Sequence, residues 1–104
     1  METHTKKRNS VGLIVGRFQP LHFGHTNLID TMLKENDVGI VLIGSSEKNL
    51  TTLNPFTYEQ RLQMFKLWNR EGLLIQPICD INARNPEDWV SYIKSVLMGE
   101  VWYR

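Results

Sequence analysis

The sequence contains a single cysteine among 104 residues, so no disulfide bond can form within the chain. This scarcity excludes the class of small secreted domains held together by disulfides, and it is typical of a reducing compartment. We therefore expect a cytoplasmic location. Cys79 follows the apolar segment 74–78, a position that favours a small buried hydrophobic residue over a reactive thiol.

Long hydrophobic runs and an excess of one charge are also lacking. No apolar stretch approaches the roughly 20 residues that span a bilayer, so we expect no membrane partner. The net charge is +1, which predicts no broad basic surface for nucleic acid, and any phosphate binding must be local. Segment 1–10 lacks the apolar core of a signal peptide, so we expect a flexible arm there and one domain over 11–104.

Apolar segments with two different periods alternate along the chain. Short continuous apolar runs are typical of strands covered on both faces of a parallel sheet, and helical spacing of apolar residues separates them. Strands are expected at 11–15, 38–43 and 73–78, with a fourth beginning at 101–103, and helices are expected to start near His25, Thr57 and Asn85. This order predicts an α/β fold with a parallel sheet.

Local signals mark the ends of the second and third helices. Thr57 and Gln60 have the spacing of a capping box, and Gly72 is expected to stop that helix. Asn85 and Pro86 are a typical N-cap and first position for the next helix, which Gly99 should end. Its buried stripe is expected to comprise Trp89, Val90, Ile93, Val96 and Leu97.

The loop after the first strand carries an unusual set of residues. Arg17, His22 and His25 lie within ten positions that also include Gly16 and Gly24. In parallel sheets, ligands bind beyond the carboxyl ends of the strands, and a glycine-rich loop leading into a helix is suited to phosphate. Two loop histidines and an arginine can also be ordinary surface residues, but their position between a buried strand and a helix argues against that interpretation.

The sequence shows no carboxylate pair, nucleophile and base, or Cys/His metal cluster beside this loop. We therefore expect a site that holds and neutralises phosphates without attacking them. Positioning and charge stabilisation do most of the work in phosphoryl and nucleotidyl transfer.

The segment 16–25, Gly-Arg-Phe-Gln-Pro-Leu-His-Phe-Gly-His, resembles the HxGH signature of nucleotidyltransferases. It is similar to the fuller form of the archaeal-type nicotinamide mononucleotide (NMN) adenylyltransferases. Three further segments agree with that family: 44–46 (Gly-Ser-Ser), 54–61 (Asn-Pro-Phe-Thr-Tyr-Glu-Gln-Arg) and 80–82 (Asp-Ile-Asn) with Trp89 downstream. The resemblance implies a Rossmann-like sheet of order 3-2-1-4(-5) that stops after about two thirds of a family member, without the C-terminal strand and helices.

The resemblance also implies roles for the loop residues. His22 and His25 would contact the phosphates of ATP and stabilise charge at the α-phosphate, and Arg17 would hold the triphosphate. Gly24 would leave room for the adenosine. Gly16, Phe18 and Gln19 would shape the loop through backbone contacts.

Four residues outside the loop have implied roles with alternatives. Arg61 would be a second arginine of the site, or else a solvated helix charge. Asn54 would stabilise its loop or touch substrate, and Asp80 would orient substrate or bind through a Mg²⁺ water, or form a turn. Trp89 would stack on the nicotinamide ring, or belong to the core.

The implied activity is transfer of AMP from Mg²⁺-ATP to NMN, giving NAD⁺ and pyrophosphate. The alternatives are another HxGH enzyme, such as a pantetheine-phosphate adenylyltransferase or a cytidylyltransferase, and an ATP-binding fragment without catalysis. A sheet that stops early leaves the first strand with an unpaired edge, so we expect self-association or pairing with a chain that completes the sheet.

Overall fold

The computed structural model describes residues 7–81 and 85–98. Strands and helices alternate in it: β1 (Lys7–Gly16), α1 (Phe23–Glu35), β2 (Asn36–Ile43), α2 (Tyr58–Trp68), β3 (Leu73–Pro77) and α3 (Pro86–Leu97). The strands are parallel and lie in the order β1-β2-β3. This confirms an α/β fold and the 3-2-1 part of the expected strand order. Gly99 and the expected strand at 101–103 lie outside the described residues.

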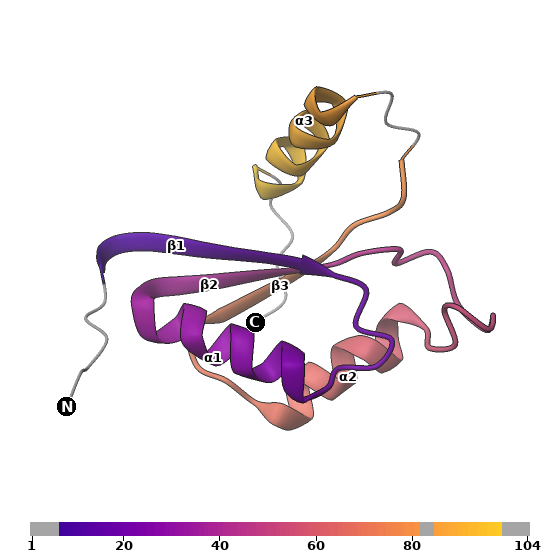
Figure 1. Ribbon diagram of the computed structural model, residues 1–104, viewed down its shortest axis with the longest axis horizontal. Helices are drawn as coiled ribbons and strands as arrows, with labels where there is room; N and C mark the ends of the chain where they lie inside the picture. Colours follow the sequence, from indigo (N-terminus) through magenta and orange to yellow (C-terminus); the bar gives the residue numbers. More distant parts are fainter. Residues whose placement is uncertain (1–6, 82–84, 99–104) are drawn as a thin grey trace.

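The helices lie on both sides of the sheet. Figure 1 shows α1 and α2 below the three strands and α3 above them. The core lies between the sheet and the lower pair of helices. It joins apolar side chains of α1 and α2 to those of β2 and β3, among them Ile29, Phe65, Val41, Ile43 and Ile75. This layer fixes the strand ends from which the loops emerge.

Two glycines let α1 approach the sheet closely. Gly12 of β1 is paired in register with Gly39 of β2. A Cβ atom at Gly12 would lie 2.3 Å from Cγ of Met32, and one at Gly39 would lie 2.6 Å from Cε of the same side chain. The paired glycines therefore form a notch that receives the Met32 side chain, which is a buried core residue.

The upper face of β1 is open to solvent, contrary to the expectation that this strand is covered on both faces. Val11, Leu13 and Val15 point to that face and are 58%, 43% and 43% exposed. Their alternation with Gly12 and Ile14 follows from the period of two in a strand. The residues are apolar as in a buried strand, but nothing among the described residues covers them.

The predicted helix starts are confirmed and one predicted end is corrected. Thr57 caps α2 in a capping box with Gln60, and Asn85 caps α3 with Pro86 in its first turn. However, α2 ends at Trp68, before the expected stop at Gly72. It ends there because Asn69 takes the left-handed conformation that closes a helix.

Three other expectations are corrected. Strand β1 begins at Lys7, so residues 7–10 of the expected arm belong to the sheet. Helix α3 has no buried residue among those described: Trp89, Ile93, Val96 and Leu97 of its predicted stripe are half-buried, and Val90 is 48% exposed. Cys79 is exposed, since it lies past the end of β3 instead of within it.

No helix in the described part of the chain is long and apolar enough to cross a membrane.

The notch predicts the stability of two glycine variants. Gly12→Ala should lower the free energy of unfolding by about 1–3 kcal/mol, because its methyl group overlaps Met32. Gly44→Ala is the control, since the nearest atom to its Cβ would be Gly16 O at 3.5 Å, an ordinary contact, and its stability should stay within about 1 kcal/mol. Urea denaturation measures both.

The same clash predicts coupling between the two residues. Combined with Met32→Ala, the Gly12→Ala substitution should be less harmful than it is alone, because the overlapping side chain is gone. Additive losses in the double variant would show that Met32 does not set the cost.

Candidate functional site

The predicted site residues gather where the strands end. The loop after β1 carries Arg17 to His22, the turn after β2 carries Gly44 and Ser45, and Asp80 follows β3. Because the strands are parallel, these three exits lie along one edge of the sheet. The histidines stand at the start of α1, which begins at this edge.

His22 and His25 form the N-terminal cap of α1. The backbone N–H of Gly24 donates to Nδ1 of His22 at 3.1 Å, and the backbone N–H of His22 donates to Nδ1 of His25 at 3.3 Å. These are the two reciprocal bonds of a capping box, with histidines in the places usually taken by Ser or Thr and by Glu or Gln. The HxGH spacing is therefore also a helix-start signal.

This capping arrangement fixes which nitrogen carries the proton when a ring is neutral. Each Nδ1 accepts a backbone N–H, so in a neutral imidazole the proton belongs on Nε2. The two rings stack with centroids 3.8 Å apart. The pair therefore offers two Nε2–H donors from one place at a helix N-terminus, an arrangement suited to an anionic ligand.

His25 is held toward its neutral form. Partial burial lowers the pKa of His25, and the neighbouring His22 lowers it further. The burial comes partly from Phe18, whose ring meets the His25 ring edge-on at 4.6 Å between centroids. A neutral His25 keeps Nδ1 free to accept the cap bond.

Several contacts shape the loop before α1. The Phe18 backbone lies in the left-handed region with φ 53°, and its ring is buried against Phe65. A Cβ at Gly16 would lie 3.1 Å from that ring. The Gln19 amide donates to Phe56 O at 3.0 Å and accepts from Phe56 N at 2.8 Å. The Gly16 carbonyl also accepts the Gly44 N–H at 2.7 Å, so backbone and side-chain contacts both hold this loop.

Gly24 leaves room for the His22 ring. A Cβ at this position would lie 3.0 Å from Cε1 and 3.3 Å from Nδ1 of His22. The absence of a side chain at Gly24 therefore lets the His22 ring lie where it caps α1.

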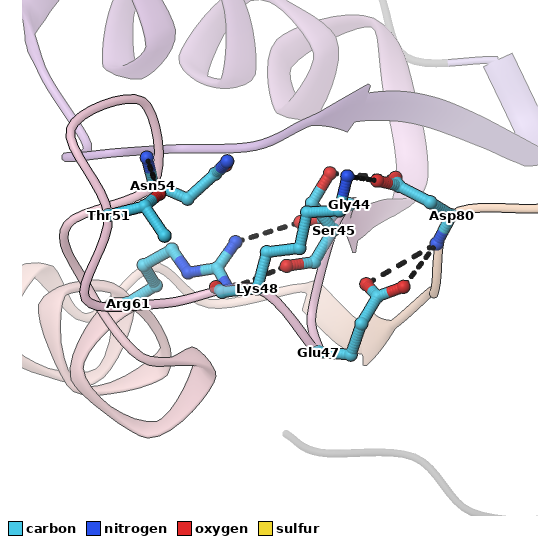
Figure 2. A network of polar contacts seen from close by, with 8 residues as sticks. All are labelled: Gly44, Ser45, Glu47, Lys48, Thr51, Asn54, Arg61 and Asp80. Atoms are coloured by element: carbon cyan, nitrogen blue, oxygen red, sulfur yellow. Dashed lines mark hydrogen bonds and ion pairs between the residues drawn. The ribbon is translucent and has the colours of Figure 1, made fainter.

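Arg61 is the most buried charged side chain described, with an exposed fraction of 0%. Its guanidinium group donates to five backbone carbonyl groups, those of Arg17, Gly44, Ser45, Lys48 and Thr57, at 2.8 to 3.4 Å. Figure 2 shows it beside the turn after β2. Burial lowers the pKa of Arg61, but a guanidinium stays charged in proteins.

This geometry corrects both expectations for Arg61. It is not a solvated helix charge, because water does not reach it. It is also not placed to bind substrate directly, because a guanidinium has five N–H donors and all five are engaged by carbonyl groups.

Arg17 remains exposed and reaches toward the turn after β2. Its Cγ would lie 4.0 Å from a Cβ at Gly44, so its side chain runs over the Gly44–Ser45 turn. The backbone of Arg17 is held by Arg61. The backbone of Arg17 is therefore fixed, and its exposed side chain leaves the guanidinium group in solvent.

Asp80 is the centre of a polar network at the same edge. Ser45 Oγ donates to Asp80 Oδ1 at 2.7 Å, and Lys48 Nζ lies 2.8 Å from Asp80 Oδ2. The Glu47 carboxylate accepts the Asp80 backbone N–H at 3.1 Å. The hydrogen bonds from Lys48 and Ser45 lower the pKa of Asp80. The hydrogen bond between Lys48 and Asp80 also raises the pKa of Lys48. Figure 2 shows this network.

Asn54 supports its loop through the backbone. Its N–H donates to Thr51 Oγ1 at 2.9 Å, and its carbonyl accepts from the N–H of Thr51 at 3.2 Å. The residue is buried, and its side-chain Oδ1 has no hydrogen-bond partner among the described residues. The loop-stabilising alternative is therefore the one that these contacts favour.

Trp89 belongs to α3, the helix that lies on the opposite side of the sheet from α1 (Figure 1). It is partly buried, and its ring lies 5.8 Å from that of Tyr92. The Tyr92 hydroxyl accepts the Cys79 backbone N–H at 2.7 Å. This bond ties the Trp89 helix to the exit of β3, next to Asp80.

No group of three or more His, Cys, Asp or Glu side chains that could hold a metal ion occurs among residues 7–81 and 85–98. A magnesium ion needs only one or two carboxylates when substrate phosphates supply its other ligands.

Comparison with known proteins agrees with this site. Residues 13–101 match the family model described as cytidylyltransferase-like. The chain belongs to this family. The match includes the histidine capping box, the turn after β2 and the exit of β3.

Curated relatives of this cytidylyltransferase-like chain are nicotinamide-nucleotide adenylyltransferases. That of Thermoplasma volcanium is 39% identical over 87 residues, which cover 80% of this chain and 48% of the relative. That of Thermoplasma acidophilum is 36% identical over 100 residues, which cover 92% and 53%. The chain spans about half the length of these relatives.

A solved structure has the same fold. It is a bifunctional NMN adenylyltransferase/ADP ribose pyrophosphatase from Francisella tularensis, complexed with AMP and a manganese ion. The TM-score is 0.72 at 29% identity, over 84% of this chain and 27% of that one.

Sequence reasoning missed two features of this cytidylyltransferase-like site. Lys48 gave no signal, because a lysine in a polar loop looks solvated until the fold brings it to Asp80, 32 positions away. The capping role of His22 and His25 had a signal, the N-cap to N3 spacing before an apolar helix, although histidines are unusual there.

The His25 environment predicts a pH dependence. Its pKa in the folded chain lies below the usual value of about 6.5. The stability that comes from a neutral His25 is therefore present above about pH 6.5, and it is lost as pH falls through the folded pKa. Lowering the pH from about 7.5 to 5.5 should reduce the free energy of unfolding in urea.

Two variants keep the cap and test the causes. His25→Gln retains a capping-box residue but cannot titrate, so its stability should fall less on acidification. His22→Asn retains a good N-cap and removes the second ring, so the pKa of His25 should rise, yet stay below 6.5 because burial is the larger cause. NMR titration of the ring protons measures this, and a lower His25 pKa in His22→Asn would contradict the assignment.

Proposed function

We propose that the site transfers AMP from Mg²⁺-ATP to NMN, giving NAD⁺ and pyrophosphate. The observation that carries the proposal is the His22–His25 pair, which offers two Nε2–H donors at the start of α1. The names of the curated relatives support the choice of reaction. Since the chain spans about half of those relatives, the proposal concerns the site that this half contributes.

The reaction needs no covalent enzyme intermediate. An oxygen of the NMN 5′-phosphate attacks the α-phosphorus of ATP, the bond from that phosphorus to the bridging oxygen breaks, and pyrophosphate leaves with the electron pair. Charge grows on the oxygens around the α-phosphorus, where preorganised donors are most effective. In this proposal His22 and His25 supply those donors, and Arg17 holds the triphosphate.

The remaining residues divide between the two substrates. Mg²⁺ enters as the counter-ion of the ATP phosphates. Asp80, held rigid by Ser45 and Lys48, orients the acceptor, and Trp89 stacks on its nicotinamide ring. Asn54 keeps the loop after β2 in place beside them. Gly16, Phe18, Gln19 and Gly24 set the loop that presents the histidines.

The second candidate is a nucleotide-binding unit that does not turn over alone. The observation in its favour is the coverage of about half of each relative. β1 is a terminal strand of the described sheet and pairs there with β2 alone, which supports pairing with a second copy or with a chain that completes the sheet. Sedimentation of a single monomeric species would contradict that pairing.

His22 variants test the reaction. His22→Ala and His22→Asn should each lower the rate of NAD⁺ formation by about 10²–10³-fold, the usual loss when one donor to the transition state is removed. Because Asn keeps the helix cap, a lower rate in His22→Asn cannot be attributed to fraying of α1. The assay follows NAD⁺ from ATP, Mg²⁺ and NMN, and calorimetry follows ATP binding in parallel.

The outcomes separate the candidates. ATP binding without NAD⁺ formation supports the binding unit and rejects catalysis by this chain. A wild-type rate in His22→Asn would remove the histidine from the mechanism.

A further inference from the structure

We propose that Arg61 is a positioning residue of the nucleotide site, which sets the spacing between the histidine loop and the turn after β2 without touching substrate. The inference rests on the proposed function for the identity of the ligand. It concerns a residue whose five hydrogen bonds all go to the protein's own backbone.

The bonds of Arg61 join segments that are far apart in sequence. Nη1 donates to Arg17 O at 3.0 Å and to Gly44 O at 2.8 Å, so one nitrogen bridges the exits of β1 and β2. Nη2 donates to Ser45 O at 3.0 Å and to Lys48 O at 3.4 Å. A rigid planar group therefore fixes these exits relative to one another.

The same bonds place the groups that face the ligand. Arg17 presents its charged end from a backbone that Arg61 holds, and Ser45, whose carbonyl Arg61 holds, binds Asp80 through its hydroxyl. A change at Arg61 thus moves Arg17 and the Ser45–Asp80 pair together. One group therefore connects the residues proposed for ATP with the residue proposed for the acceptor.

A lysine cannot replace this arginine. An ammonium group has three donors at one point, whereas these carbonyl groups lie around a planar fork of five. Arg61→Lys therefore keeps the charge and loses the geometry. Arg70→Lys is the matched control, because Arg70 also bonds across elements, to Asp30 at 3.0 Å and to Trp68 O at 3.1 Å, but at the other end of α2.

The first experiment measures Mg²⁺-ATP affinity by calorimetry at a temperature where circular dichroism shows each variant to be folded. Arg61→Lys should bind at least tenfold more weakly than the wild type, and Arg70→Lys within twofold, even where both lose thermal stability. A purely structural role would lower the melting temperature and leave the affinity of the folded protein unchanged. Wild-type affinity in folded Arg61→Lys overturns the proposal.

The second experiment needs no variant. In the wild-type chain, the Arg61 side-chain nitrogens should keep their ¹⁵N chemical shifts and slow proton exchange when Mg²⁺-ATP is added, while the Arg17 signals move. Arg61 shifts as large as those of Arg17 would make it a ligand and overturn the proposal, even if Arg61→Lys fails to fold.

The results distinguish this inference from the proposed function. ATP binding that depends on Arg61 supports the inference whether or not NAD⁺ forms. ATP affinity that is the same in the wild type and in Arg61→Lys rejects the inference and does not affect the proposed function. A wild-type chain that binds no ATP rejects both.

Discussion

The carbonyl groups at the ends of β1 and β2 need hydrogen-bond donors, and one buried guanidinium group supplies them. A buried carbonyl group without a donor destabilises a fold by about 1–3 kcal/mol. Arg61 donates to five carbonyl groups, of which those of Ser45 and Thr57 also accept a backbone N–H. Because Arg61 belongs to α2, the packing of α2 on the sheet decides where the loops lie. The core residues Leu62 and Phe65, which follow Arg61 on the same helix, are therefore connected to the geometry of the site.

The two histidines combine a structural and a chemical task because an imidazole has two nitrogens. Nδ1 of each ring closes the start of α1, and Nε2 is left for a ligand. Protonation of Nδ1 removes the cap acceptor, so helix integrity and the neutral state of the rings are linked. Phe18 strengthens the link by packing its ring against both His25 and Phe65. The site is thus built into the core on one side and open on the other.

Features encoded by neighbouring residues could be predicted from the sequence. The caps at Thr57 and Asn85 and the order of strands and helices follow from local spacing. The role of Arg61 could not be predicted, because its partners are backbone carbonyl groups, which every residue has and which leave no pattern in a sequence. The exposure of Val11 and Leu13 could not be predicted either. Both residues are apolar, as in a core, but their burial depends on a covering layer that the described residues do not provide.

The charges at the strand exits explain how a chain with a net charge of +1 can attract a polyanion. Lys48 is neutralised by Asp80 at 2.8 Å, so it adds little to the potential that an approaching ligand meets. Arg61 bonds only to neutral carbonyl groups, and the nearby charges of Glu47 and Glu59 offset only part of its own. Arg17 and the N-terminus of α1 add to that charge on the solvent side. Since ionic screening limits such fields to about 8 Å at physiological salt, this attraction acts on a phosphate chain at the edge of the sheet and not on ligands elsewhere on the surface.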